Sequence, residues 1–272
     1  MEKRKTLQEL TIKDNFMFGV VMADEEVCGK FLEMVLGITI THIEVCREKS
    51  LVYHPEYKGV RLDVYARGKD NTHYNIEMQA VCKTELGKRS RYYHSQMDME
   101  LLSAGRVYEE LPQGYVIFVC DFDPFGYKKY QYTFAQQCRE EPGIRGMDGS
   151  YTIFLSTKGE NAGEVTKELE AFLKYVKANL NESQEKVEDD FVTLLQERVG
   201  KIKRDREMEE RFMLLEEMLK DERSQGIEEG RKEARQEMVM ALLRAGVDVK
   251  VIQQASGVSE EELEELQRDM GI

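Results

Sequence analysis

The sequence predicts a mixed α/β domain followed by an all-helical extension. Two stretches in the first half alternate apolar and polar residues on either side of a turn sequence. A later apolar run has the length of a buried strand, and a segment with helical spacing separates it from the alternating pair. Beyond about residue 164 only helical patterns occur, and residues 188–240 contain no proline. Together these observations favour a central sheet flanked by helices, with helices alone after it.

Two helices are expected within 11–37, and a strand is expected at 38–45. Asp24 can cap the second helix, and Gly37 lies just past its end, where a left-handed residue commonly ends a helix. The segment 38–45 alternates and is rich in Ile and Thr, which suits an extended chain.

The next part predicts a β-hairpin, a helix and a buried strand. Val60–Arg67 and His73–Ala80 both alternate with period two, and the Gly-Lys-Asp-Asn-Thr sequence between them supplies turn residues. Glu85–Glu110 has helical spacing and ends at Leu-Pro-Gln-Gly. Tyr115–Cys120 is a continuous apolar run, typical of a strand buried on both faces. The remaining strand candidates are Tyr127–Phe134 and Tyr151–Leu155.

The extension is expected to hold long charged helices and a small helical tail. Residues 188–240 are crowded with Glu, Lys and Arg, so one or two exposed helices are expected, with a break considered near Gly226 and Gly230. The tail suggests three short helices, and a Ser-Glu-Glu-Glu capping box at Ser259 opens the last. The expected organisation is therefore a domain over 1–160, a charged helical segment over 161–236 and a tail over 237–272.

Composition narrows the classes of protein further. The net charge is −13, of which −3 falls in residues 1–150 and −10 in residues 151–272, which argues against broad affinity for phosphate but permits a local basic groove in the first half. Five cysteines, an odd number with no C-x-x-C pair, make a disulfide framework or a zinc knuckle unexpected. We expect a cytoplasmic protein and no membrane segment, since no apolar run approaches the roughly 20 residues that a transmembrane helix needs.

The informative feature of the hairpin is a pair of carboxylates. A five-residue loop places Arg67 opposite His73 and therefore Asp63 opposite Glu77, with Gln79 one pleat further along the same face. Two ionised carboxylates at such range repel, so one must take up a proton or a cation must lie between them. Mg²⁺ or Mn²⁺ suits an all-oxygen site of this kind and could activate a water. The alternative is two exposed acids at a sheet edge, each paired with a basic residue.

Several motifs in this order resemble one family. They are Asp14-Asn15-Phe16-Met17-Phe18, Arg61-Leu62-Asp63-Val64, Asn75-Ile76-Glu77-Met78-Gln79, and Arg89 with Tyr92-Tyr93. Over about the first 160 residues and again in the tail, the chain resembles the recombination-promoting nuclease (Rpn) and putative transposase family, part of the PD-(D/E)XK nuclease superfamily. The resemblance implies a restriction-endonuclease-like αβββαβ core, a divalent metal and a DNA substrate.

The resemblance also implies roles for residues. Asp63 and Glu77 would be metal ligands, joined by the Met78 carbonyl, and Gln79 would orient the attacking water where most of the superfamily carries lysine. Asp14 matches the acidic position of the first helix, although it could equally be an N-cap.

Basic residues gather at the start of the helix after the hairpin. There Arg89 and Lys83, with Tyr93, could contact a DNA phosphate, and Lys83, Lys88 or Arg89 could take over the charge that Gln79 lacks. The alternative is a core tyrosine with a solvated basic face.

Three functions are consistent with these observations. The first is a metal-dependent DNA endonuclease of the transposase or recombination-promoting type, which hydrolyses phosphodiesters. The second is a catalytically inactive nuclease-fold scaffold that binds protein partners through its acidic helical half. The third is a protein that binds DNA through its C-terminal tail. Residues 259–270 carry six acids and one arginine, and DNA phosphates would repel them. Oligomerisation or partner docking is therefore the favoured role for the tail.

Overall fold

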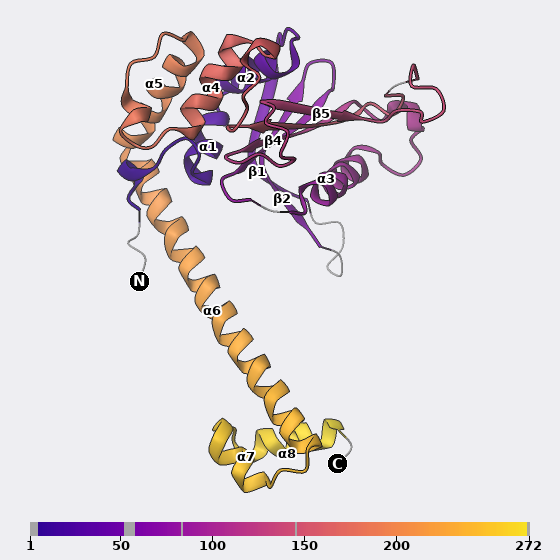
Figure 1. The fold of residues 1–272 in the computed structure, drawn as a ribbon, viewed down its shortest axis with the longest axis vertical. Helices are drawn as coiled ribbons and strands as arrows, with labels where there is room; N and C mark the ends of the chain where they lie inside the picture. Colours follow the sequence, from indigo (N-terminus) through magenta and orange to yellow (C-terminus); the bar gives the residue numbers. More distant parts are fainter. Residues whose placement is uncertain (1–4, 52–57, 83, 145, 271–272) are drawn as a thin grey trace. The chain divides into compact units, whose positions relative to one another are not determined.

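The computed structural model describes residues 5–51, 58–82, 84–144 and 146–270, without the side chains of the last two. These residues form two compact units, Met1–Met208 and Glu209–Ile272. The first unit is a six-stranded mixed sheet with helices on both faces, as the sequence predicted (Figure 1). The sheet unit includes α4 and α5, which the sequence analysis assigned to the helical segment after residue 160.

The strand order is β1-β2-β3-β4-β6-β5. The hairpin strands β2 and β3 pair antiparallel, as do β1 with β2 and β5 with β6, whereas β3, β4 and β6 run parallel. The strands are β1 Ile43–Leu51, β2 Val60–Gly68, β3 His73–Gln79, β4 Gly114–Cys120, β5 Gln131–Ala135 and β6 Ser150–Ser156. The central strands are buried on both faces, which confirms the interpretation of the apolar run over Tyr115–Cys120.

Helices cover the two faces of the sheet unequally. The helices α1, α2, α4 and α5 group on one side, and α3 alone covers the other (Figure 1). Their bounds are α1 Asn15–Met22, α2 Glu25–Leu36, α3 Leu86–Leu101, α4 Lys167–Lys177 and α5 Asp190–Arg204. The ring of Phe172 in α4 contacts the rings of Phe31 and Phe191, which joins the four-helix side into one apolar layer.

Local capping explains where several helices begin and end. The Asp24 carboxylate accepts hydrogen bonds from the backbone N–H groups of Glu26 and Val27, and Gly37 ends α2 at φ +67°, as expected. The predicted helix over Glu85–Glu110 is too long, because α3 ends at Leu101 and Gly105 adopts φ +86°. Tyr108, which lies within the predicted helix, is exposed. The first strand also begins later than predicted, at Ile43 instead of Ile38.

The long charged region contains a break, but the glycines do not make it. α6 runs unbroken over Arg206–Arg244, including Gly226 and Gly230. The break lies at Asp205, whose carboxylate accepts from the backbone N–H of Glu207 at 2.9 Å. A glycine in a helix costs only about 1 kcal/mol, whereas an aspartate offers a cap that favours a new helix start.

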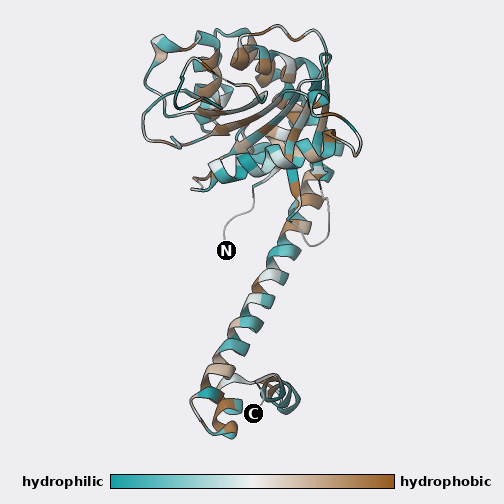
Figure 2. Ribbon diagram, turned by 90° about the vertical axis from the view of Figure 1, so that its right-hand side faces the viewer, coloured by the Kyte–Doolittle hydropathy of each residue, from teal (hydrophilic) through white to brown (hydrophobic). Residues whose placement is uncertain are grey.

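The second unit has its own small core. Val239, Ile252, Val258 and Leu263 are buried together where the end of α6 meets α7 Val249–Ser256 and α8 Glu260–Met270. The Ser259 capping box is present, with the Glu262 carboxylate 3.0 Å from the Ser259 backbone nitrogen. The middle of α6 is largely hydrophilic, whereas the strands of the first unit are largely hydrophobic (Figure 2). Among the described residues, no helix is both long and apolar enough to span a membrane.

Candidate active site

The hairpin pairs in the predicted register. Arg67 lies opposite His73, and the ladder continues as far as Val64 opposite Ile76. The loop closes through a hydrogen bond from the Gly68 backbone N–H to the Thr72 carbonyl at 2.8 Å. The next positions along the two strands are Asp63 and Glu77, so the predicted juxtaposition of the acids is present.

At these acids, side chains replace the backbone ladder. The Asp63 backbone N–H donates to Glu77 Oε1 at 3.2 Å, and the Met78 backbone N–H donates to Asp63 Oδ2 at 3.1 Å. Each carboxylate therefore accepts a hydrogen bond from the backbone of the opposite strand. This exchange holds both acids in the gap between β2 and β3 and fixes their orientation.

The neighbouring ladder is interrupted at the same level. β1 and β2 pair up to Arg47 opposite Val64 and resume at Lys49 opposite Leu62. Glu48, which would lie opposite Asp63, adopts φ +58°. Both ladders are therefore interrupted at the level of Asp63, although the register of β1 and β2 is the same on either side of the gap.

The carboxylates do not lie at an exposed sheet edge, so that alternative is wrong for Glu77. Glu77 is 0% exposed on a central strand, and Asp63 is half-buried. Burial, together with the neighbouring Asp63 charge, raises the pKa of Glu77 to about 7, although Arg89 opposes the shift. Burial likewise raises the pKa of Asp63, against the lowering effect of the Met78 N–H and Arg89. The pair therefore holds a proton more readily than ordinary carboxylates do.

Arg89 is the cation that faces this pair. Its Nη2 lies 2.9 Å from Glu77 Oε2, and its Nη1 donates to Gln79 Oε1 at 3.4 Å. Its Nε donates to the Tyr93 hydroxyl at 2.5 Å, and that hydroxyl lies 3.3 Å from Glu77 Oε2. The first two turns of α3 thus bring Arg89 and Tyr93 onto the hairpin strands, where they contact Glu77 and Gln79, so four of the residues singled out in the sequence meet here.

One of the sequence candidates, Asp14, is not part of this cluster. Asp14 precedes α1 at the N-cap position, but its carboxylate binds Lys5 Nζ at 2.7 Å and the Thr11 backbone N–H at 2.7 Å. None of its contacts among the described residues reaches Asp63 or Glu77. The geometry therefore favours a structural role for Asp14, which stabilises the segment that contains Lys5 and Thr11. Lys83 lies outside the described residues.

The donor set fits a hard divalent cation. Asp63, Glu77 and Gln79 offer side-chain oxygens, and no sulfur or imidazole lies among them. In a strand the N–H and C=O of one residue point to the same side, so the Met78 carbonyl faces the gap into which its N–H donates. No group of three or more His, Cys, Asp or Glu side chains suited to a metal occurs in the described part of the chain. An ion here would need Met78, Gln79 and water to complete its coordination.

The sequence analysis missed some polar residues around this cluster. Asn75 is 0% exposed on β3, two residues before Glu77, and both of its amide atoms lack a hydrogen-bond partner among the described residues. Period-two alternation places it on the face of Glu77, so the pattern could have identified it. Asp121 follows β4 directly, and its backbone N–H donates to the Gln79 carbonyl at 3.0 Å. A polar residue at the carboxyl end of a buried strand was the available signal.

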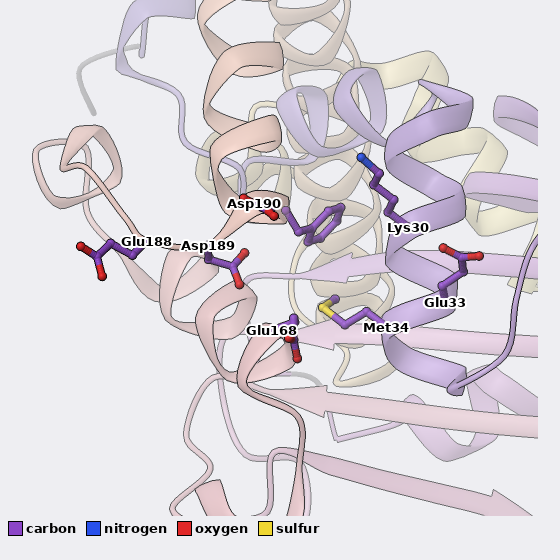
Figure 3. A pocket seen from close by; sticks show the side chains of 8 residues that line it. Lys30, Glu33, Met34, Glu168, Glu188, Asp189 and Asp190 are labelled. Carbon is purple, nitrogen blue, oxygen red and sulfur yellow. The ribbon is translucent and has the colours of Figure 1, made fainter.

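A pocket among the described residues lies away from this cluster. It has a volume of about 470 Å³ between α2, α4 and the start of α5, and Figure 3 shows its acidic lining. Asp189 in this lining caps α5 through the Val192 N–H at 2.8 Å. None of the residues that line this pocket belongs to the cluster around Glu77. The candidate site is therefore identified by its chemical groups and not by the volume of a pocket.

A mixed sheet whose hairpin carries Asp63 and a Glu-x-Gln sequence, with an arginine from the following helix, defines an α/β protein of the PD-(D/E)XK type. Comparison of the sequence with known protein families agrees with this class. The family model described as "PD-(D/E)XK nuclease family transposase" matches residues 15–245, so the chain belongs to that family. Neither the curated proteins nor the solved structures contain a significant match. Nucleases of this superfamily generally use divalent metals.

Proposed function

We propose that this chain is a divalent-metal-dependent DNA endonuclease with its site at the break in the β2–β3 ladder. The observation that carries the proposal is the exchange of hydrogen bonds between Asp63 and Glu77 on opposite strands. That exchange turns two acids toward one place, where a proton or a nearby cation must offset their repulsion. Family membership makes a nuclease or transposase function the expected use of such a pair.

Each residue of the cluster would then have its own role in phosphodiester hydrolysis. Asp63, Glu77 and the Met78 carbonyl would hold Mg²⁺ or Mn²⁺, which lowers the pKa of a bound water and offsets charge on the phosphate. Gln79 would orient the attacking water through its amide, since it has no ionisable group to exchange a proton. Arg89, supported by the Tyr93 hydroxyl, would donate to a non-bridging phosphate oxygen. In the reaction the water oxygen bonds to phosphorus, one ester P–O bond breaks, and the leaving oxygen takes a proton.

The test uses variants that keep the size of each side chain. Asp63→Asn and Glu77→Gln should lose nicking of supercoiled DNA in Mg²⁺ or Mn²⁺ and should lose a saturable Mn²⁺ site in calorimetric titration. Glu44→Gln is the matched control, because Glu44 is an exposed acid on the adjacent strand that pairs with Arg67. Cleavage at the wild-type rate by either site variant would show that the site is misassigned.

A second candidate is a nuclease-fold scaffold that associates through its C-terminal helices. Four large apolar side chains of α6 are exposed within two turns, and they are Met213, Leu214, Met218 and Leu219. Such a patch favours contact with a protein surface, for example a second copy of the chain. A monomer at all concentrations in sedimentation experiments would exclude the self-association, and absent Mn²⁺ binding together with association would favour the scaffold.

A further inference from the structure

The carboxyl ends of the three parallel strands meet at one edge of the sheet. β3, β4 and β6 end at Gln79, Cys120 and Ser156, which lie in register side by side. The following residues tie these ends together, because the Asp121 N–H donates to the Gln79 carbonyl and the Thr157 N–H donates to the Cys120 carbonyl, both at 3.0 Å. Ligands of open sheets with parallel strands commonly bind beside such an edge.

Two lysines from distant parts of the chain converge on Asp121 at this edge. Lys13 Nζ lies 3.4 Å from Asp121 Oδ2, and Lys158 Nζ lies 3.6 Å from Asp121 Oδ1. The Thr157 hydroxyl donates to Asp121 Oδ1 at 2.8 Å. Asp121 is mostly buried, so the carboxylate is fixed by its own neighbours and by the strand end while the two ammonium groups approach it from outside.

The ion pairs of these lysines are long. Ammonium–carboxylate hydrogen bonds usually measure about 2.7–2.9 Å, so neither lysine is tightly bound to Asp121. By contrast, Lys128 pairs with Glu160 at 2.8 Å and Lys129 pairs with Glu164 at 2.7 Å, one acid for each base. At Asp121 one carboxylate faces two ammonium groups, which leaves a local excess of positive charge in a chain of net charge −13.

We propose that Lys13 and Lys158 form a binding site for a DNA backbone phosphate next to the metal site, and that Asp121 faces both lysines when no DNA is bound. The inference rests on the proposed nuclease function, since it places a second phosphate of the same strand beside Gln79. Both side chains are accessible, at 29% and 43% exposure, so a phosphate can reach them. This site would also supply the positive charge that Gln79 does not carry.

Equilibrium binding of duplex DNA in Ca²⁺ at several salt concentrations tests the proposal. Neutralising one phosphate contributes about 0.9 to the slope of log K against log salt, so Lys13→Gln and Lys158→Gln should each lower the slope, and the double variant should lower it by about one in all. Lys128→Gln, a control of equal charge change at a fully paired lysine, should leave it unchanged. Circular dichroism and melting temperatures establish that each variant is folded.

Asp121→Asn separates a phosphate site from an internal ion pair. If the lysines serve DNA, removing the carboxylate charge frees them, and the affinity for DNA should rise severalfold. An unchanged slope in both lysine variants, or weaker binding by folded Asp121→Asn, would overturn the inference.

The binding experiments give a different result if the proposed nuclease function itself is wrong. In that case Mn²⁺ binding would not depend on Asp63, or the wild-type chain would not bind DNA, and the phosphate site would fall with it. Mn²⁺ binding that Asp63→Asn abolishes, together with lysine variants that keep the wild-type slope, would refute the phosphate site alone.

Discussion

The raised pKa of Glu77 predicts a specific dependence of stability on pH in the metal-free protein. Burial and the Asp63 charge raise the pKa of Glu77 from its ordinary value of 4.5 to about 7. The folded state therefore keeps a proton that the unfolded state has already released over this range. Its stabilising effect is full below about pH 4.5 and is lost as pH rises through about 7.

The magnitude follows from the size of the shift. Each pKa unit corresponds to about 1.4 kcal/mol, so full ionisation of Glu77 costs the folded state roughly 3 kcal/mol relative to a normal glutamate. The total stability curve does not show this effect alone, because His73 acts in the opposite direction over an overlapping range. The difference in unfolding free energy between Glu77→Gln and the wild type isolates it, since His73 is common to both.

The assay is chemical denaturation in EDTA at a series of pH values. The stability of Glu77→Gln relative to the wild type should increase by roughly 3 kcal/mol between about pH 5 and pH 8. Glu44→Gln, at an exposed and paired acid, should show no such trend. Mg²⁺ should restore the stability of the wild type at high pH but not that of Glu77→Gln. A difference that does not vary with pH would refute the reasoning that Glu77 is buried beside a second carboxylate.

Three further predictions test other parts of the structure. Arg89→Met should bind Mn²⁺ more tightly than the wild type, because the variant lacks the guanidinium that faces Glu77 Oε2. Arg91→Met, a change at an exposed arginine, should bind Mn²⁺ as the wild type does. Titration calorimetry measures both affinities, and weaker binding by Arg89→Met would contradict the argument. Burial lowers the pKa of His73 to about 4, so the stability of the wild type relative to His73→Gln should fall by roughly 3 kcal/mol on acidification from about pH 6.5 to 4; a difference that does not change with pH would exclude the effect. Phe172→Ala should destabilise the sheet unit by about 3–5 kcal/mol, whereas a loss below 1 kcal/mol would mean that α4 does not pack there.

The parts of the fold that local chemistry determines could be predicted from the sequence. Alternation and the turn sequence gave the hairpin register, and Asp24 and Gly37 marked the ends of α2, because a cap or a left-handed glycine acts within a few residues. The sequence also placed Arg89 and Tyr93 on one helical face, and both meet Glu77. These features depend on the period of apolar residues and on the spacing between side chains, and both can be measured in the sequence.

Features that depend on contacts between distant segments could not be predicted. The replacement of the ladder by the Asp63 and Glu77 side chains coincides with the left-handed conformation of Glu48 on a third strand, and no pattern in the sequence indicates either feature. Asp14 binds Lys5 and Thr11 instead of the site, although its motif position suggested an acid near the metal. Lys13 and Lys158 lie far apart in the chain, one before α1 and one after β6, and both approach Asp121 at the end of β4.

A crystal structure with bound Mn²⁺, located by its anomalous scattering, tests the central claim most directly. We expect one ion at about 2.1–2.2 Å from oxygens of Asp63, Glu77 and the Met78 carbonyl, with the Arg89 guanidinium turned away from Glu77 Oε2. An ion bound elsewhere, or Arg89 still paired with Glu77 at saturating Mn²⁺, would contradict the assignment of this site.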